Sequence, residues 1–323
     1  MRKRTLVVTR HFSDIGVPAM LATTSRFSLP LQAVLWGLLL INGFLIALML
    51  ALAKAATSLG LPAVAYAFWQ TLVAGLVLLL CTGERRAIHQ ARFARYFLVS
   101  GLTGIAVPNA IGFFLVTKLG AGYTGIMYAL PPIFTFLLAW GLGLENRNWL
   151  KLAGLSIAVM ACGWIVVQRH AEMSNASPLL FVLGLAIPVM LSVGNVYRSV
   201  AWPAKAKPMI LAAGTLLASA LALALFAAMT NTELLPSGTS PQLIGILLLQ
   251  GLLTALTYLV AFELQRRAGP VFYSQLGAVA AVFGLLIGVV WFREEYSVAI
   301  WLGVFLVVLG LRISNRATAP SQS

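Results

Sequence analysis

Long apolar runs separated by short polar turns make up most of this chain. Residues 121–144 carry no charged side chain, and a helix rising about 1.5 Å per residue needs only roughly 20 residues to cross about 30 Å of hydrocarbon. The polar turn Glu-Asn-Arg-Asn follows at 145–148, and a second apolar run begins directly after it. The same pattern predicts ten membrane-spanning helices, at residues 33–57, 61–81, 97–117, 121–144, 149–168, 178–200, 209–229, 241–262, 270–292 and 297–314.

Two adjacent prolines, Pro131 and Pro132, stand halfway along the fourth predicted span. Proline lacks the backbone N–H that a helical hydrogen bond needs, and its ring clashes with the preceding turn, so a pair of prolines kinks a helix. We therefore expect a structural kink at the middle of the membrane, where backbone carbonyl groups are released from the helix.

The stretch around these prolines is repeated later in the chain. A weaker match at a shift of 144 residues pairs Lys54 with Arg198 and Thr71 with Thr215. Chance similarity between Leu-rich segments explains such matches less well than duplication, because the matched positions include charges, glycines and aromatic residues. The main match, at a shift of 149 residues, pairs Phe113 with Phe262, Lys118 with Arg267, Gly120 with Gly269, Tyr123 with Phe272, Glu145 with Glu294 and Gly154 with Gly303.

Two halves of about five spans each have a topological consequence. An odd number of spans per half makes the second half enter the membrane from the opposite side, an arrangement common in secondary transporters with a midplane site. The predicted fold is therefore an all-α polytopic membrane protein of ten transmembrane helices in two inverted five-helix repeats. The predicted organisation is a basic cytoplasmic tail at 1–32, a first repeat at 33–170, a second repeat at 177–314 and a cytoplasmic tail at 315–323.

Composition agrees with a membrane protein and explains the positive charge. Mean hydropathy is +0.94 and only 9% of residues are charged, too few to cover a water-soluble surface. With the N-terminus inside, 18 of the 22 basic residues fall in cytoplasmic segments, as the positive-inside rule requires. We therefore expect a multi-pass protein of the bacterial inner membrane, with both termini cytoplasmic and the true start at Met1 or Met20. The net charge of +14 needs no nucleic-acid partner.

Acidic residues are absent from the centres of the predicted spans, since all of them fall in tails, loops or helix ends. A buried carboxylate relay for proton coupling is therefore not predicted, and an intramembrane enzyme would lack its acid, base and metal. The cysteines, Cys81 and Cys162, show no disulfide pattern, and no spacing of ligand residues indicates a metal site. We expect no cofactor.

Neutral polar and aromatic residues are the candidates for a solute-binding cavity. Gln250, Thr254 and Tyr258 recur every four residues and so share one helix face. Such residues also serve as hydrogen-bond links between helices, and both interpretations stay open; Gln70 and Thr215 are expected on more peripheral helices. The predicted cavity residues are Asn42, Asn109, Phe113, Tyr128, Asn195, Gln250, Thr254, Tyr258, Tyr273 and Gln275.

Glu145 and Glu294 occupy matching helix exits in the two halves. A carboxylate at such a place accepts backbone N–H donors at the start of the next helix, so we expect a structural capping role. The alternative is an ion pair with a basic residue that closes a gate.

Together these motifs resemble those of the EamA-type transporters of the drug/metabolite transporter superfamily. The resemblance rests on Lys118-Leu-Gly-Ala-Gly through Pro131, Glu145 to Gly154, Phe262 through Arg267-Ala-Gly-Pro270, and Glu294 with Gly303. It implies ten helices in inverted repeats, cytoplasmic termini and a central cavity formed mainly by spans 1, 3, 4, 6, 8 and 9. The chain departs from the family in having Gln70 where many members carry Arg, and Ala280 where the first copy has Pro131.

The predicted function is secondary transport rather than catalysis. The resemblance implies an exporter of small metabolites such as amino acids, working by alternating access through a central cavity. The alternatives are a multidrug efflux pump for hydrophobic or cationic compounds and, from a different class, a membrane-embedded enzyme or lipid-handling scaffold. The expected partners are a small-molecule solute and membrane lipids, in a monomer or homodimer.

Overall fold

The computed structural model describes residues 29–83, 90–112, 114–115, 127–170, 178–235, 240–293, 295 and 297–316, and within these ranges regular structure is helical throughout. Phe113, Glu294 and the repeat motif at 118–125 lie outside the described residues. The elements are α2 (Leu29–Ser58), α3 (Ala63–Cys81), α4 (Ala91–Gly101), the π-helical turn η3 (Leu102–Ala106), α6 (Pro131–Gly141), α7 (Trp149–His170), α8 (Pro178–Val200), α9 (Pro208–Met229), α10 (Pro241–Ser274), α11 (Leu276–Phe292) and α12 (Val298–Arg316).

The outer surface of the helix bundle is apolar. Large aliphatic side chains such as Met229, Val290 and Val298 are more than four-fifths exposed, which hydrocarbon tolerates and water does not. Helices α2, α3, α8, α9 and α10 are long and apolar enough to cross a membrane, and α6, α7, α11 and α12 contribute shorter apolar segments. The chain is therefore a multi-pass membrane protein, while the count of ten crossings stays a prediction.

Helix ends follow most of the predicted spans closely, but the third, fourth, eighth and ninth differ. Helix α8 has the predicted bounds of 178–200, whereas the eighth span was predicted to end at 262 and α10 continues to Ser274. The continuation is not a straight helix: the backbone is non-helical at Gly269, with a φ of 77° and a ψ of 178°, a conformation that glycine adopts without steric cost. Pro270 then starts a short helical turn in a new direction.

Helical geometry is also interrupted at the third and fourth spans. The third begins as α4, at residue 91 instead of 97, and passes through the π turn η3 before helix resumes at residues 107–112 and 114–115. In the fourth, helical residues 127–129 end at Leu130, and Pro131 and Pro132 occupy the first turn of α6. The hydrogen-bonded helix is therefore interrupted at the predicted place, while Leu130 keeps helical backbone angles of φ −76° and ψ −23°, as in a proline kink.

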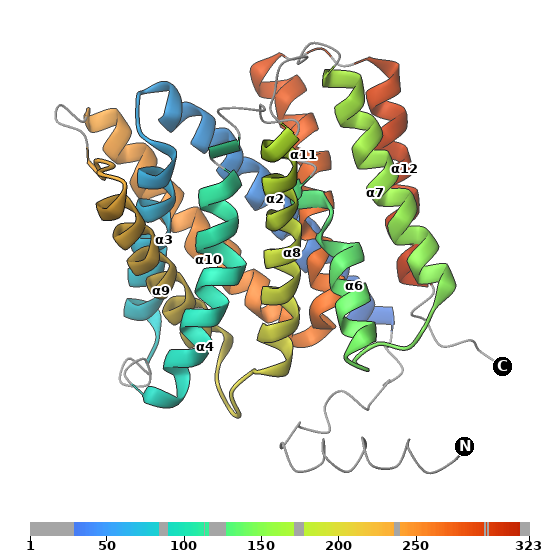
Figure 1. The fold of residues 1–323 in the computed structure, drawn as a ribbon, viewed down its shortest axis with the longest axis horizontal. Coiled ribbons are helices and arrows are strands. Elements are labelled where there is room, and N and C mark those ends of the chain that lie inside the picture. Colours follow the sequence, from blue (N-terminus) through green and yellow to red (C-terminus); the bar gives the residue numbers. More distant parts are fainter. Residues whose placement is uncertain are drawn as a thin grey trace.

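The contacts between helices come in matched pairs. Helices α2, α3, α4, α6 and α7 of the first half correspond in order to α8, α9, α10, α11 and α12 of the second. The α2–α11 contact therefore corresponds to the α8–α6 contact, and the α3–α10 contact to the α9–α4 contact. All four contacts are present. The α3–α9 and α7–α12 contacts each join counterpart helices and map onto themselves. Counterparts run in opposite directions along the bundle (Figure 1). This is the pattern of an inverted repeat about a pseudo-two-fold axis.

One end of the bundle collects the segments that were predicted to be cytoplasmic. Helix α2 begins and α12 ends at the lower end in Figure 1, and the α6–α7 and α8–α9 connections lie at the same end. Basic residues Arg147, Lys205 and Lys207 belong to these connections. Positive charge is therefore gathered on one side of the predicted membrane.

Small residues let several helices approach closely. A Cβ atom on Gly154 of α7 would lie 2.6 Å from the carbonyl oxygen of Gly310 on α12, and one on Gly310 would lie 2.6 Å from that of Gly154. A Cβ on Gly277 of α11 would overlap the carbonyl oxygen of Tyr128. Glycine thus brings α11 against the interruption that precedes α6.

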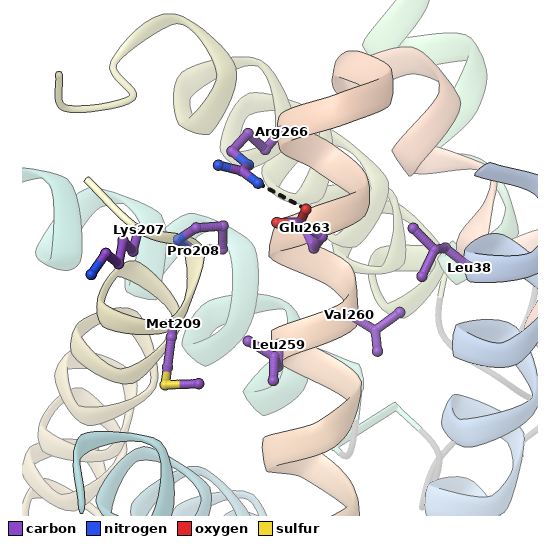
Figure 2. A pocket seen from close by; sticks show the side chains of 8 residues that line it. All are labelled: Leu38, Lys207, Pro208, Met209, Leu259, Val260, Glu263 and Arg266. Carbon is purple, nitrogen blue, oxygen red and sulfur yellow. Dashed lines mark hydrogen bonds and ion pairs between the residues drawn. The ribbon is translucent and has the colours of Figure 1, made fainter. Parts of the chain in front are cut away.

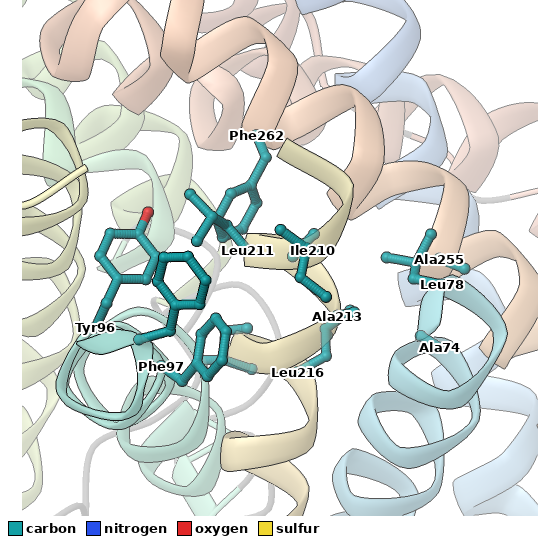
Figure 3. Packing of buried hydrophobic residues seen from close by; sticks show 13 residues of the cluster. Ala74, Leu78, Tyr96, Phe97, Ile210, Leu211, Ala213, Leu216, Ala255 and Phe262 are labelled. Atoms are coloured by element: carbon teal, nitrogen blue, oxygen red, sulfur yellow. The ribbon is translucent and has the colours of Figure 1, made fainter. Parts of the chain in front are cut away.

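An aromatic and aliphatic cluster fills the space between α3, α4, α9 and α10 (Figure 3). Tyr96 and Phe97 of α4 face Leu211 and Ile210 of α9, and Phe262 reaches the cluster from α10. The ring of Phe97 occupies the space beside Gly214. This packed cluster joins α4 to α9 and α10.

Candidate functional site

Arg198 of α8 is the largest fully buried side chain among the described residues, with only 1% of its surface exposed. The sequence predicts it among the 18 basic residues of the cytoplasmic segments, whereas the structure buries its side chain between helices. Side chains on a helix lean toward its N-terminus, so an arginine near the end of α8 reaches back into the bundle. The signal was available in the sequence, because residue 198 lies within the predicted span 178–200 and matches Lys54 in the repeat.

The Arg198 guanidinium is held by amide side chains from two helices. Its Nε donates to Gln265 Oε1 of α10 at 2.8 Å, and its Nη2 donates to Asn195 Oδ1 at 2.6 Å. Gln265 Nε2 in turn donates to the Asn195 carbonyl oxygen at 2.7 Å and to Ser199 Oγ at 3.1 Å. The predicted cavity residue Asn195 therefore belongs to a buried network with Arg198 and Gln265, which sequence reasoning missed.

Aromatic rings and a glycine complete the surroundings of Arg198. Its guanidinium carbon lies 5.3 Å from the ring centroid of Tyr273 and 5.7 Å from that of Phe262, within the range of cation–π attraction. Its Nη1 fills the position that a Cβ on Gly104 would take. Gly104 lies in the π turn η3, a feature found often at functional sites.

The charge of Arg198 is not neutralised within the part of the chain that the structure describes, where no carboxylate lies within ion-pair distance of it. The acid nearest in sequence to Gln265, Glu263, bonds to Arg266 at 2.8 Å and to Arg267 at 2.5 Å. These pairs lie on a face of α10 with exposed arginines. A buried cation supported only by neutral acceptors is costly inside a membrane protein.

Three tyrosines lie near this network. Tyr258 lies near Tyr128, Tyr273 and Arg198, and the three tyrosine side chains are each partly exposed. The Tyr128 hydroxyl lies 2.9 Å from the Pro108 carbonyl oxygen and 3.2 Å from Asn109 Oδ1. The structure thus brings four predicted cavity residues, Asn109, Tyr128, Tyr258 and Tyr273, to the same region as Arg198.

Gln250 and Thr254, also predicted for the cavity, lie in a separate cluster. Gln250 Nε2 donates to Gln70 Oε1 of α3 at 2.9 Å and lies 3.3 Å from Thr254 Oγ1. Gln250 and Thr254 are fully buried, and Gln70 is 6% exposed. The link to Met49 of α2 is weaker, with Thr257 Oγ1 3.2 Å from its sulfur. These contacts are hydrogen-bond links between helices, one of the two interpretations that the sequence left open.

Gln70 and Thr215, predicted to lie on peripheral helices, are buried. Thr215 Oγ1 lies 3.4 Å from Ser100 Oγ, and both residues face other helices. Each is buried because α3 packs against α9 and α10, and α9 packs against α3, α4 and α10; the peripheral position of the two helices stays a prediction.

Asn42 and Gln275 are fully buried on α2 and at the junction of α10 with α11. Neither polar atom of the Asn42 amide has a hydrogen-bond partner among the described residues. An unpartnered buried amide costs free energy. Asn42 is therefore the predicted cavity residue with the clearest capacity for a further ligand, solute or water.

Glu145 and its neighbours define the turn between α6 and α7. The first turn of α7 is capped by Asn148, whose Oδ1 accepts from the Lys151 backbone N–H at 3.0 Å. Glu145 Oε2 instead pairs with Lys151 Nζ at 2.9 Å, and that ammonium group is largely buried. The capping role expected of Glu145 is thus filled by Asn148, because the asparagine is closer to the helix start.

An open groove of about 540 Å³ lies beside α10 (Figure 2). It is lined by Leu38 of α2, Lys207, Pro208 and Met209 at the start of α9, and Leu259, Val260, Glu263 and Arg266 of α10. The α10 residues that line it differ in helical position from Tyr258, Phe262 and Gln265, so the groove and the Arg198 network occupy different faces of α10. Over the described ranges, no group of three metal-ligating residues is found.

Comparison with known proteins gives a match over most of the chain. The sequence model described as "EamA-like transporter family" matches residues 32–167 and again residues 178–316. No curated protein sequence matches. One solved structure, described only as "Crystal structure of protein", superposes with a TM-score of 0.70 at 19% identity, covering 88% of this chain and 98% of the other. At that identity the likeness shows the fold alone.

Proposed function

The chain belongs to the EamA-like transporter family, and from that premise we propose that it exports small metabolites such as amino acids across a bacterial inner membrane. Membership in a family of transporters, within the drug/metabolite transporter superfamily, sets the enzyme alternative aside. Under this proposal both termini face the cytoplasm, and the solute passes by alternating access through a central cavity.

The observation that carries the proposal is the gathering of partly exposed tyrosines beside interrupted helices. Tyr128 precedes the interruption at Leu130, and Tyr273 follows the turn at Gly269. Interrupted helices at the interface of two inverted repeats are typical of solute sites in secondary transporters, because their free backbone groups face a cavity. Tyrosine offers a hydroxyl and a ring face, which suit a small amphipathic solute.

A pump for hydrophobic cations has less support. Such a solute requires an acidic partner or a neutral aromatic cage, whereas the only buried charge described near the three tyrosines is the cation Arg198. Electrostatic repulsion between the two positive charges would oppose binding.

Transport by the reconstituted protein tests the proposal. In proteoliposomes loaded with labelled amino acids, we expect Tyr128→Phe and Asn109→Ala to lower flux about tenfold, the effect of one or two lost hydrogen bonds in the transition between states. Tyr197→Phe is the matched control, since its hydroxyl contacts the Arg95 carbonyl oxygen at 3.4 Å at an exposed position. Unchanged flux in both test variants, at normal expression, would remove the site assignment.

A further inference from the structure

The buried charge of Arg198 specifies what the transported solute must carry, and this inference rests on the proposed function. We propose that Arg198 binds a carboxylate group of the solute, and that this carboxylate neutralises the guanidinium during transport. The solute is therefore a carboxylic or amino acid with an apolar or aromatic body.

The first support is the imbalance of charge. Arg198 is 1% exposed, and among the described residues its hydrogen bonds go to the neutral amides of Gln265 and Asn195. Neutral acceptors satisfy geometry but leave a full positive charge in a region of low dielectric constant. An anion that enters the site gains the attraction that these amides do not supply.

The second support is the donors that remain. A guanidinium has five N–H groups, and only Nε and Nη2 have partners among the described residues. Nη1 packs against Gly104 at the place that a Cβ would occupy, and it has no hydrogen-bond partner among the described residues. The unused N–H groups of Nη1 and Nη2 form the planar fork that matches the two oxygens of a carboxylate.

The third support is the chemistry of the neighbouring walls. Tyr273 and Phe262 present ring faces to the guanidinium, and Tyr258 lies near it. Gly104, Tyr258 and Tyr273 are partly exposed although Arg198 is not. A carboxylate that reaches the guanidinium from these residues would leave its organic body against aromatic rings.

A structural alternative is that Arg198 only locks α8 to α10. That role would be satisfied by the amide network as it stands, would not need an unused face of the guanidinium, and would not discriminate between charged and neutral solutes. The two roles therefore differ in ligand binding and not merely in stability.

Matched ligand pairs separate the two roles. The purified protein in lipid nanodiscs is titrated, by thermal shift and isothermal calorimetry, with phenylalanine against phenylalaninamide and with 3-phenylpropionate against 3-phenylpropionamide. We expect each acid to raise the melting temperature and its amide to have little effect. Inorganic phosphate is a further probe, and stabilisation by phosphate without stabilisation by either acid would overturn the choice of carboxylate.

Variants assign the effect to Arg198. Arg198→Gln should weaken binding of the acids about 10- to 100-fold, the value of a charge-assisted hydrogen-bonded pair, and Arg198→Lys should weaken it less because charge remains without the fork. Arg312→Gln, which changes an exposed arginine of α12, is the matched control and should bind as the native protein does.

A second variant distinguishes lost ligand binding from misfolding of the Arg198 variants. Gln265→Glu places a carboxylate where Nε already has its acceptor, and it removes the donor to the Asn195 carbonyl oxygen and Ser199 Oγ. Because the new carboxylate neutralises the guanidinium, binding of the acids should weaken about tenfold or more. A purely structural Arg198 predicts unchanged ligand binding.

Three results would overturn the inference: equal binding of acids and amides, undiminished binding by Arg198→Gln, or no response of the native protein to any acid. If an amide is transported equally well, and its flux still depends on Tyr128 and Asn109, the proposed function stands and only the carboxylate assignment fails. If flux is insensitive to those two residues, the proposed function fails instead.

Discussion

Two polar clusters lie along α10, one around Gln250 and one around Gln265, and they differ in charge. The first joins Gln250 to Gln70 and Thr254 and contains only neutral groups. The second joins Gln265 to Asn195 and to the guanidinium of Arg198. Both are buried and both link α10 to another helix, so burial and hydrogen bonding alone do not separate a packing contact from a binding site.

The difference teaches where to look for function in a membrane bundle. A neutral pair of amides needs no counter-ion, although Gln250 Oε1 has no partner among the described residues, and replacing both members by apolar residues has little cost. A buried charge without a counter-ion is not neutralised, and only an anion from outside the described network can neutralise it. Charge balance is therefore a sharper guide than polarity.

The largest expected effect comes from removing an acceptor of the charged cluster. Gln265→Leu leaves Arg198 Nε without its partner and should destabilise the protein by about 3 kcal/mol, because an ionised group is then left unsatisfied in the interior. Unfolding in mixed detergent micelles, followed by circular dichroism, measures the change. Gln265→Asn is the companion variant, and equal loss in both would mean that side-chain volume rather than hydrogen bonding matters.

A smaller effect is expected from the neutral cluster. Gln250→Leu leaves the amide of Gln70 without its partner and should lower the free energy of unfolding by about 1 to 2 kcal/mol. The double variant Gln70→Leu with Gln250→Leu should recover most of that loss. The same unfolding assay measures both, and transport should stay within about twofold of the native rate in the double variant if this cluster only packs. A transport-dead double variant of native stability would return Gln250 to the solute site.

Asn42 offers a variant in which stability and transport are expected to move in opposite directions. Its amide has no partner among the described residues, so Asn42→Leu, of similar volume, should stabilise the resting protein by about 1 kcal/mol. If Asn42 contacts the solute, flux falls at the same time. Thermal unfolding and proteoliposome flux on one preparation give both values, and a stabilised variant with full flux would make Asn42 a packing residue.

The smallest combined effect on stability and flux is expected at the α6–α7 turn, outside both clusters. Glu145→Gln removes the charge that pairs with the buried Lys151 ammonium group but keeps an oxygen that can accept its hydrogen bond, and should cost about 1 kcal/mol with flux unchanged. Asn148→Ala, which removes the helix cap, should also lower the free energy of unfolding by about 1 kcal/mol. A loss of flux in Glu145→Gln alone would support the gate interpretation that the sequence left open.

Much of the fold could be predicted from the sequence because few residues decide where each helix begins and ends. Uninterrupted apolar length predicted the bounds of α8 and, within a few residues, those of α3, α7, α9 and α12. The end of the eighth span was missed, since a glycine turn carries a helix onward in a new direction without any change in composition. The boundaries of the two repeats and the site residues Asn42, Asn109 and Tyr128 stay predictions.

The sequence by itself determined that this protein is a helical membrane protein built from a repeated unit, because hydrophobic length and residue spacing are properties of the chain alone. Only the tertiary structure decided that Arg198 lies inside the bundle and that Gln250 bonds to Gln70. Those facts depend on which helices become neighbours, and α8 and α10, or α3 and α10, are brought together by packing between distant parts of the chain. A charge or an amide is a binding group or a packing group according to the partner it finds there.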